Sequence, residues 1–131
     1  MKFRKAVVVA LAALVVAAAL PTAAFAQYEK DAVVTVMKNN VVQLGAARDA
    51  AGKGDFIVAG VALADIARSM HSIKRFVPNK GDKASWDRTI DTVVLAALKG
   101  AGAAAANDKA GVDAAVAELR RLNAMGHAAH K

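Results

Sequence analysis

Two histidines near the C-terminal end of the chain, His127 and His130, stand three positions apart. In a helix this spacing places both imidazoles on one face, and imidazole is the commonest metal ligand among side chains. Far away in the sequence, Met37 offers a thioether as a second soft ligand. A thioether and an imidazole are the axial pair that holds haem iron in one class of cytochromes. These residues predict a haem site or, through the two histidines, a site for a divalent metal ion.

Three further residues, Met70, His71 and Trp86, contribute to the same group of soft and aromatic side chains. We expect Met70 and Trp86 at the end of the haem pocket, and His71 or a carboxylate as a third ligand in the divalent-metal alternative. A plainer interpretation is also open. Met37 and Met70 continue apolar stripes, where methionine often fills gaps in a core, and histidines near a fraying C-terminus are usually solvated.

The elements that must position these residues are helices. After residue 27, Gly and Pro divide the chain into four segments, and apolar residues recur in each with helical spacing. The first stripe consists of Val33, Met37, Val41 and Leu44. We predict helices over about 28–51, 55–76, a third that starts within 82–85 and fades from Gly100 to Ala106, and 109–129. Short connections favour an all-α, antiparallel up-down-up-down four-helix bundle.

In such a bundle, the first and third helices start at the same end at which the second and fourth helices finish. Met37 lies early in the first helix and His127 close to the end of the fourth. With a rise of about 1.5 Å per residue, the two levels along the bundle match. Met70 and Trp86 belong to the same end, so the topology gathers the candidate ligands into one pocket.

Residues 1–26 have the pattern of a cleavable signal peptide. A basic start over residues 1–5 precedes an apolar stretch over 6–20, and Ala24, Phe25 and Ala26 form a small-x-small cleavage site. The apolar stretch is shorter than the roughly 20 residues of a membrane span. We therefore expect one mature domain over residues 27–131, in the periplasm of a bacterium or secreted from it.

Composition limits the chemistry further. The chain has no cysteine, which excludes disulfides, thiolate metal ligands and thioether-linked haem. Three of the 18 basic residues fall in the expected leader, which leaves 15 against 11 acidic ones and a net charge of +4. The sequence has no basic stripe interleaved with aromatics, so we do not expect nucleic-acid binding. It also has no recognisable nucleophile–base motif, so we do not expect an enzyme. The expected partners are a redox protein and a second copy of the chain, with no membrane contact after cleavage.

Several short motifs follow one another along residues 28–131 in a characteristic order. They are Tyr28 with Met37 nine residues later, Gly52-Lys53-Gly54-Asp55-Phe56, Ile73-Lys74-Arg75-Phe76-Val77-Pro78, Ala84-Ser85-Trp86, Asn107-Asp108 and the C-terminal tail. In this order they resemble the cytochrome c prime superfamily, which includes a soluble periplasmic b-type cytochrome of the same fold. The resemblance implies a four-helix bundle and a haem protein of electron transport.

The tail carries the most informative part of the resemblance. In c-type members it reads Cys-x-x-Cys-His, with a basic residue four positions on, whereas this chain has Asn123-Ala124-Met125-Gly126-His127 and then Lys131. The histidine is kept and both cysteines are absent, as in the b-type relative, which binds haem noncovalently through Met and His. The resemblance therefore implies His127 as the proximal iron ligand and Met37 as the distal one.

The expected function is noncovalent binding of haem b, with no covalent haem c, and electron transfer. Two alternatives stay open. A bundle that lost its cysteines cannot attach haem covalently. The first alternative is therefore a haem-free interaction or assembly protein. The other alternative is a divalent-metal binder that uses His127 and His130.

Cleavage of the leader gives the first testable expectation. When the full chain is expressed in a bacterium with an export pathway, mass spectrometry of the exported protein should find a chain that begins at Gln27. Recovery of an intact, membrane-bound chain that begins at Met1 would contradict the interpretation of residues 1–26.

Overall fold

The computed structural model describes residues 28–130 of the chain. Within that range it has no strand and four helices, which are α2 (Lys30–Gly52), α3 (Phe56–Ile73), α4 (Lys83–Ala105) and α5 (Lys109–His130). The prediction of an all-α fold built from four helices is thus confirmed for this part of the chain. The expected signal peptide and its cleavage site lie outside the described residues.

Three helices begin at an aspartate whose carboxylate accepts a hydrogen bond from a backbone N–H three residues later. The bonds join Asp55 to Val58, Asp82 to Ser85 and Asp108 to Gly111, at 3.1, 2.6 and 2.9 Å. Such a cap satisfies one of the N–H groups that a helix start leaves unpaired, and its removal typically costs about 1 kcal/mol. The starts of α3, α4 and α5 therefore follow from aspartates that are visible in the sequence.

Two helix ends differ from the prediction. Helix α3 ends at Ile73, three residues early, and the carbonyl of Ile73 accepts two hydrogen bonds, one of 3.2 Å from the backbone N–H of Phe76 and one of 3.3 Å from the indole N–H of Trp86. Helix α4 does not fade at Gly100 but continues to Ala105. Both Gly100 and Gly102 lie within the helix despite the low helix propensity of glycine.

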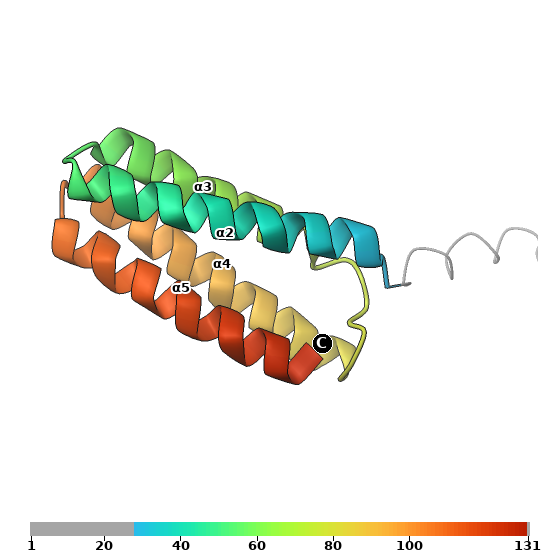
Figure 1. Cartoon of the computed structure of the whole chain (residues 1–131). Helices are drawn as coiled ribbons and strands as arrows, with labels where there is room; N and C mark the ends of the chain where they lie inside the picture. Colours follow the sequence, from blue (N-terminus) through green and yellow to red (C-terminus); the bar gives the residue numbers. More distant parts are fainter. Residues whose placement is uncertain (1–27, 131) are drawn as a thin grey trace, which may run out of the picture.

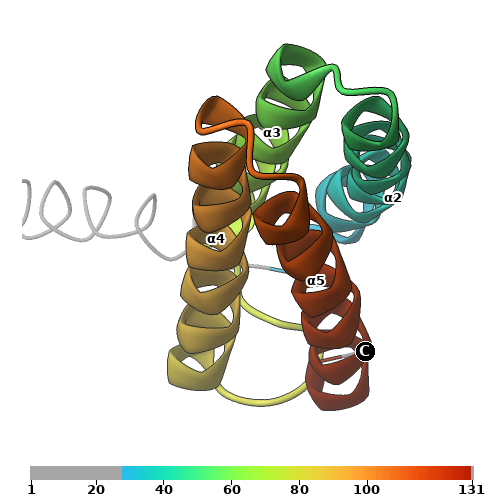
Figure 2. The ribbon, with the colours of Figure 1, turned by 90° about the vertical axis from the view of Figure 1, so that its left-hand side faces the viewer.

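The four helices form a wedge-shaped bundle (Figure 1). The loops between α2 and α3 and between α4 and α5 lie at one end, here named the closed end. The start of α2, the end of α3, the start of α4 and the end of α5 lie at the other, the open end, toward which the α2–α3 pair diverges from the α4–α5 pair. Figure 2 shows α2 beside α3 and α4 beside α5, and α2 contacts α5 only sparsely.

Alanine predominates among the buried side chains of the closed end, together with Leu63, Val112 and Val116. Its buried residues include Ala47, Ala51, Ala59, Ala62, Ala97, Ala104 and Ala115. A methyl group added at Gly100 would lie 2.7 Å from the Cβ of Ala115 and 3.0 Å from a methyl of Leu63. Since the distance between packed helices depends on the side chains at their contact, these residues draw α3, α4 and α5 together at this end.

Large side chains occupy the open end. The buried residues there include Ile66, Met70, Ile73, Trp86, Ile90, Leu119 and Leu122. Their volume holds the helices further apart than alanine does. The gradient in side-chain size along the bundle therefore accounts for its wedge shape.

The loop between α3 and α4 is tied to both helices. The ammonium group of Lys74 donates a hydrogen bond of 2.8 Å to Asp91 on α4, and that bond raises the pKa of Lys74. Lys83 in turn donates to the backbone carbonyl of Lys74 at 2.6 Å. These contacts fix the α3–α4 loop, which lies at the open end of the bundle.

Helix α3 is long and apolar enough to cross a membrane by length and composition, with a mean hydropathy of 1.4. One side of it is core, with Ala59, Ala62, Leu63, Ile66, Ala67, Met70 and Ile73 buried. Three of its other apolar residues, Ile57, Val58 and Val61, are exposed, as is Leu98 on α4. The hydropathy of α3 thus combines a core face with an apolar outer face.

The packing at Gly100 predicts opposite effects for one substitution at two positions of α4. Gly100→Ala should lower the free energy of unfolding by about 1–3 kcal/mol, because the added methyl overpacks the contact with Ala115 and Leu63. Gly102→Ala is the matched control, since nothing lies within 4 Å of its added methyl. It should raise stability by about 0.5–1 kcal/mol through helix propensity. Urea unfolding measures both, and a stabilising Gly100→Ala would contradict the packing described.

Candidate functional site

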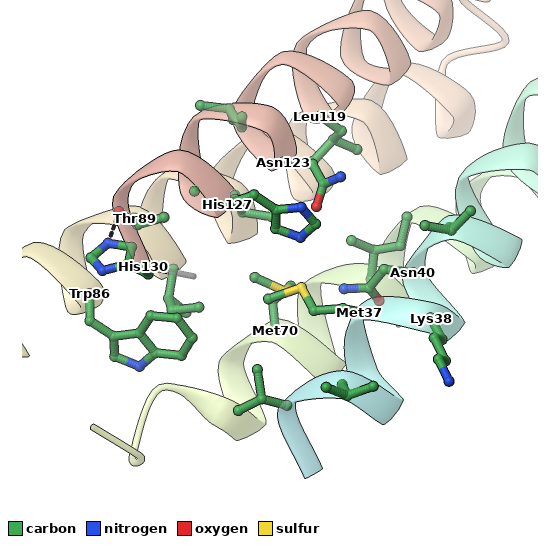
Figure 3. Close-up of a pocket in the computed structure, with 18 of the residues that line it drawn as sticks. Met37, Lys38, Asn40, Met70, Trp86, Thr89, Leu119, Asn123, His127 and His130 are labelled. Carbon is green, nitrogen blue, oxygen red and sulfur yellow. Dashed lines mark hydrogen bonds between the residues drawn. The ribbon is translucent and has the colours of Figure 1, made fainter. Parts of the chain in front are cut away.

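A cleft of about 550 Å³ opens at the open end of the bundle, between α2 and α5 (Figure 3). Its deeper walls are apolar and include Val33, Leu44, Ile66, Ile90, Val93, Leu119 and Leu122. Ligand pockets in proteins usually measure about 300–1,000 Å³ and have mostly apolar walls with a few polar groups. By size and lining, this cleft suits an organic ligand with an apolar body.

Met37 and His127 lie on opposite walls of the cleft. Met37 comes from α2 and is half-buried, whereas His127 comes from the last turns of α5 and is exposed. Figure 3 shows both side chains pointing into the space between the two helices. The structure therefore brings together a thioether and an imidazole that are 90 residues apart in the sequence.

Met70 and Trp86 also line the cleft, and both are buried. Each is only 4% exposed, so they form its inner wall. The hydrogen bond from the indole N–H of Trp86 to the carbonyl of Ile73 fixes the orientation of the ring at the open end. Both residues therefore lie where a ligand in the cleft would contact them.

His130 borders the same cleft in a different state from His127. It is 6% exposed, and both ring nitrogens have partners: Nδ1 lies 2.9 Å from the carbonyl of Lys80 and Nε2 lies 3.2 Å from the hydroxyl of Thr89. Its ring meets the Trp86 ring edge-on, with centroids 5.5 Å apart. The interpretation of the C-terminal histidines as solvated is thus wrong for His130. To bind a metal ion, His130 would first have to give up one of these hydrogen bonds.

His71 lies apart from the cleft. It is exposed near the end of α3 and is not among the residues that line the cleft. Within residues 28–130, no group of three or more His, Cys, Asp or Glu side chains is arranged to hold a metal ion. The divalent-metal alternative therefore lacks a visible third ligand in the described part of the chain.

Two asparagines that the sequence analysis overlooked face each other across the cleft (Figure 3). Asn40 lies one turn after Met37 on α2, and Asn123 lies one turn before His127 on α5. Asn40 is oriented by a hydrogen bond of 2.7 Å with the hydroxyl of Ser69. The helical spacing from Met37 and His127 was the signal that would have found both.

The outer part of the cleft leaves apolar and basic side chains uncovered. Val41 is 65% exposed, although the sequence predicted it in a buried stripe, because α5 stands too far from α2 to cover it. Lys30 and Lys38 also border the cleft, and none of the described residues that line it is Asp or Glu. An apolar ligand with acidic groups at its edge would match both properties.

Comparison with family models, with curated proteins and with solved structures finds no match to this chain. The resemblance to the cytochrome c prime superfamily therefore stays a prediction.

The two methionines of the cleft should respond differently to truncation. Met70→Ala removes a buried side chain and should lower the free energy of unfolding by about 2–5 kcal/mol. Met37→Ala, at a half-buried position that faces the cleft, should cost less than about 1 kcal/mol, within the usual range for sites outside the core. Thermal or urea unfolding of the two variants measures this difference. Equal losses would mean that Met37 is a core residue and not available to a ligand.

Proposed function

We propose that the protein is an exported, noncovalent b-type haem protein of electron transfer, folded as an antiparallel up-down-up-down bundle. The observation that carries the proposal is the apolar cleft with a thioether and an imidazole on opposite walls. Met37 and His127 are the proposed axial ligands. Met70 and Trp86 form the inner wall against which the ligand packs.

The chemistry of the cleft fits such a group in three respects. Its apolar walls match a macrocycle, its two candidate ligands match the soft donor pair of low-spin cytochromes, and Lys30 and Lys38 match the acidic substituents of haem b. When bound, haem supplies reversible one-electron chemistry. The protein contributes the ligands, an apolar enclosure and a positive rim.

Without cysteine, occupancy depends on noncovalent contacts alone. Val34 and Val41 are partly uncovered at the mouth of the cleft, and burial of such apolar surface contributes about 25 cal/mol per Å². A ligand that covers them would therefore stabilise the fold as well as bind to it. With both axial positions supplied by the protein, we propose electron transfer and not catalysis, in the periplasm or outside the cell.

The second candidate is a haem-free interaction protein, and a separate surface favours it. Ile57, Val61, Leu95 and Leu98 are all at least half exposed, on the outer sides of α3 and α4. Exposed apolar groups of this kind mark contact surfaces in many proteins. A stable, colourless protein that self-associates would support this candidate over the first.

Titration of the purified protein with hemin tests the proposal. We expect a shift of the Soret band that saturates at one hemin per chain. His127→Ala should weaken binding by about tenfold or more, because it removes the imidazole ligand, and Met37→Ala should change the spectrum of the bound form by removing the sixth ligand.

Two matched variants serve as controls. His71→Ala and Met125→Ala remove the same chemical groups from exposed positions that do not line the cleft, so both should bind hemin as the unmodified protein does. Absence of any Soret shift would rule out the proposed function. Equal affinity of His127→Ala and the unmodified protein would rule out His127 as the ligand.

A further inference from the structure

We infer that His130 is a positioning residue: it anchors the last turn of α5 to the α3–α4 loop and to the start of α4, and thereby holds His127 in the cleft. The inference rests on the proposed function only where it concerns hemin. The anchoring itself depends on contacts among the described residues.

The contacts of His130 join α5 to two other elements, the α3–α4 loop and α4. Its Nδ1 atom pairs with the carbonyl of Lys80 in the loop, its Nε2 atom pairs with the hydroxyl of Thr89 on α4, and its ring packs edge-on against Trp86 at an interplanar angle of 87°. The loop approaches this closely because Gly81 has φ +83° and no side chain. A methyl group at Gly81 would lie 3.1 Å from Nδ1 of His130.

The carbonyl of Lys80 fixes which ring nitrogen of His130 carries a proton. The carbonyl of Lys80 accepts only, so Nδ1 donates to it, and in the neutral imidazole Nε2 then accepts from the hydroxyl of Thr89. A neutral histidine with a donor on one side and an acceptor on the other satisfies both contacts at once. No apolar residue could do so.

This anchor acts where a helix is otherwise weakest. The last turn of a helix frays readily because its last carbonyls have no partners within the helix. His127 lies one turn before His130 on the same helix. Fraying of that turn would remove His127 from the wall of the cleft, whereas the anchor keeps it on the wall that faces α2.

Amide hydrogen exchange in the purified, ligand-free protein tests the anchor. Loss of two hydrogen bonds should lower protection of the amides of residues 124–130 by about tenfold or more in His130→Ala. His130→Gln should restore much of it, because the side-chain amide also offers a donor and an acceptor. Thr89→Val, which removes one partner and leaves His130 in place, should lie between the two.

The fluorescence of Trp86 provides an independent measurement of the contacts around His130. It is the only tryptophan of the chain, so its fluorescence reports on this site alone and should change in His130→Ala but less in His130→Gln. Unchanged amide protection at His127 in both His130→Ala and Thr89→Val would overturn the inference, even if the fluorescence changed.

Hemin titration of the same variants separates this inference from the proposed function. If the unmodified protein binds hemin, His130→Ala should bind about tenfold more weakly, in line with the loss of a positioning contact, and His130→Gln should recover affinity. Unaltered affinity in His130→Ala would overturn the positioning role. If the unmodified protein binds no hemin, the proposed function fails, and the exchange data alone decide on the anchor.

Discussion

The close approach of α3, α4 and α5 around Gly100 is the constraint on which the rest of the structure depends. Gly100 meets Ala115 and Leu63 at distances that leave no room for a methyl group, so the helices converge at the closed end and diverge where larger side chains begin. Divergence separates α2 from α5 and uncovers the apolar face of α2. A cleft is thus a consequence of the size gradient in the core, and a ligand that fills it would complete the packing that the protein alone leaves open.

The end of α5 shows how two identical side chains on one helix face acquire different roles. His130 is buried with both nitrogens paired, whereas His127 is exposed in the cleft. Burial and fixed partners suit a structural contact. An accessible imidazole opposite a thioether suits a ligand. The division of roles follows from position, since His130 meets the loop and α4 while His127 meets only the space between α5 and α2 (Figure 3).

Much of the fold was predictable because its signals are local. The Gly and Pro breaks and the apolar periodicity identified the four helices, and Met37, Met70, Trp86 and His127 all line one cleft. The misses involve contacts between distant residues. Periodicity assigned Val41 to the core, but exposure depends on how far α5 stands from α2. Likewise, nothing near His130 in the sequence reveals Lys80 and Thr89 as its partners.

Haem binding through Met37 is the proposal on which the function of the cleft between α2 and α5 rests. Its most direct test is the NMR spectrum of protein labelled with ¹³C at the methionine methyl groups, recorded during titration with hemin under reducing conditions. Met37, Met70 and Met125 lie respectively at the wall, at the inner face and outside the cleft. We predict a large shift for the Met37 methyl, a smaller one for Met70 and none for Met125. A Met37 signal that stays in place while hemin binds would contradict the account.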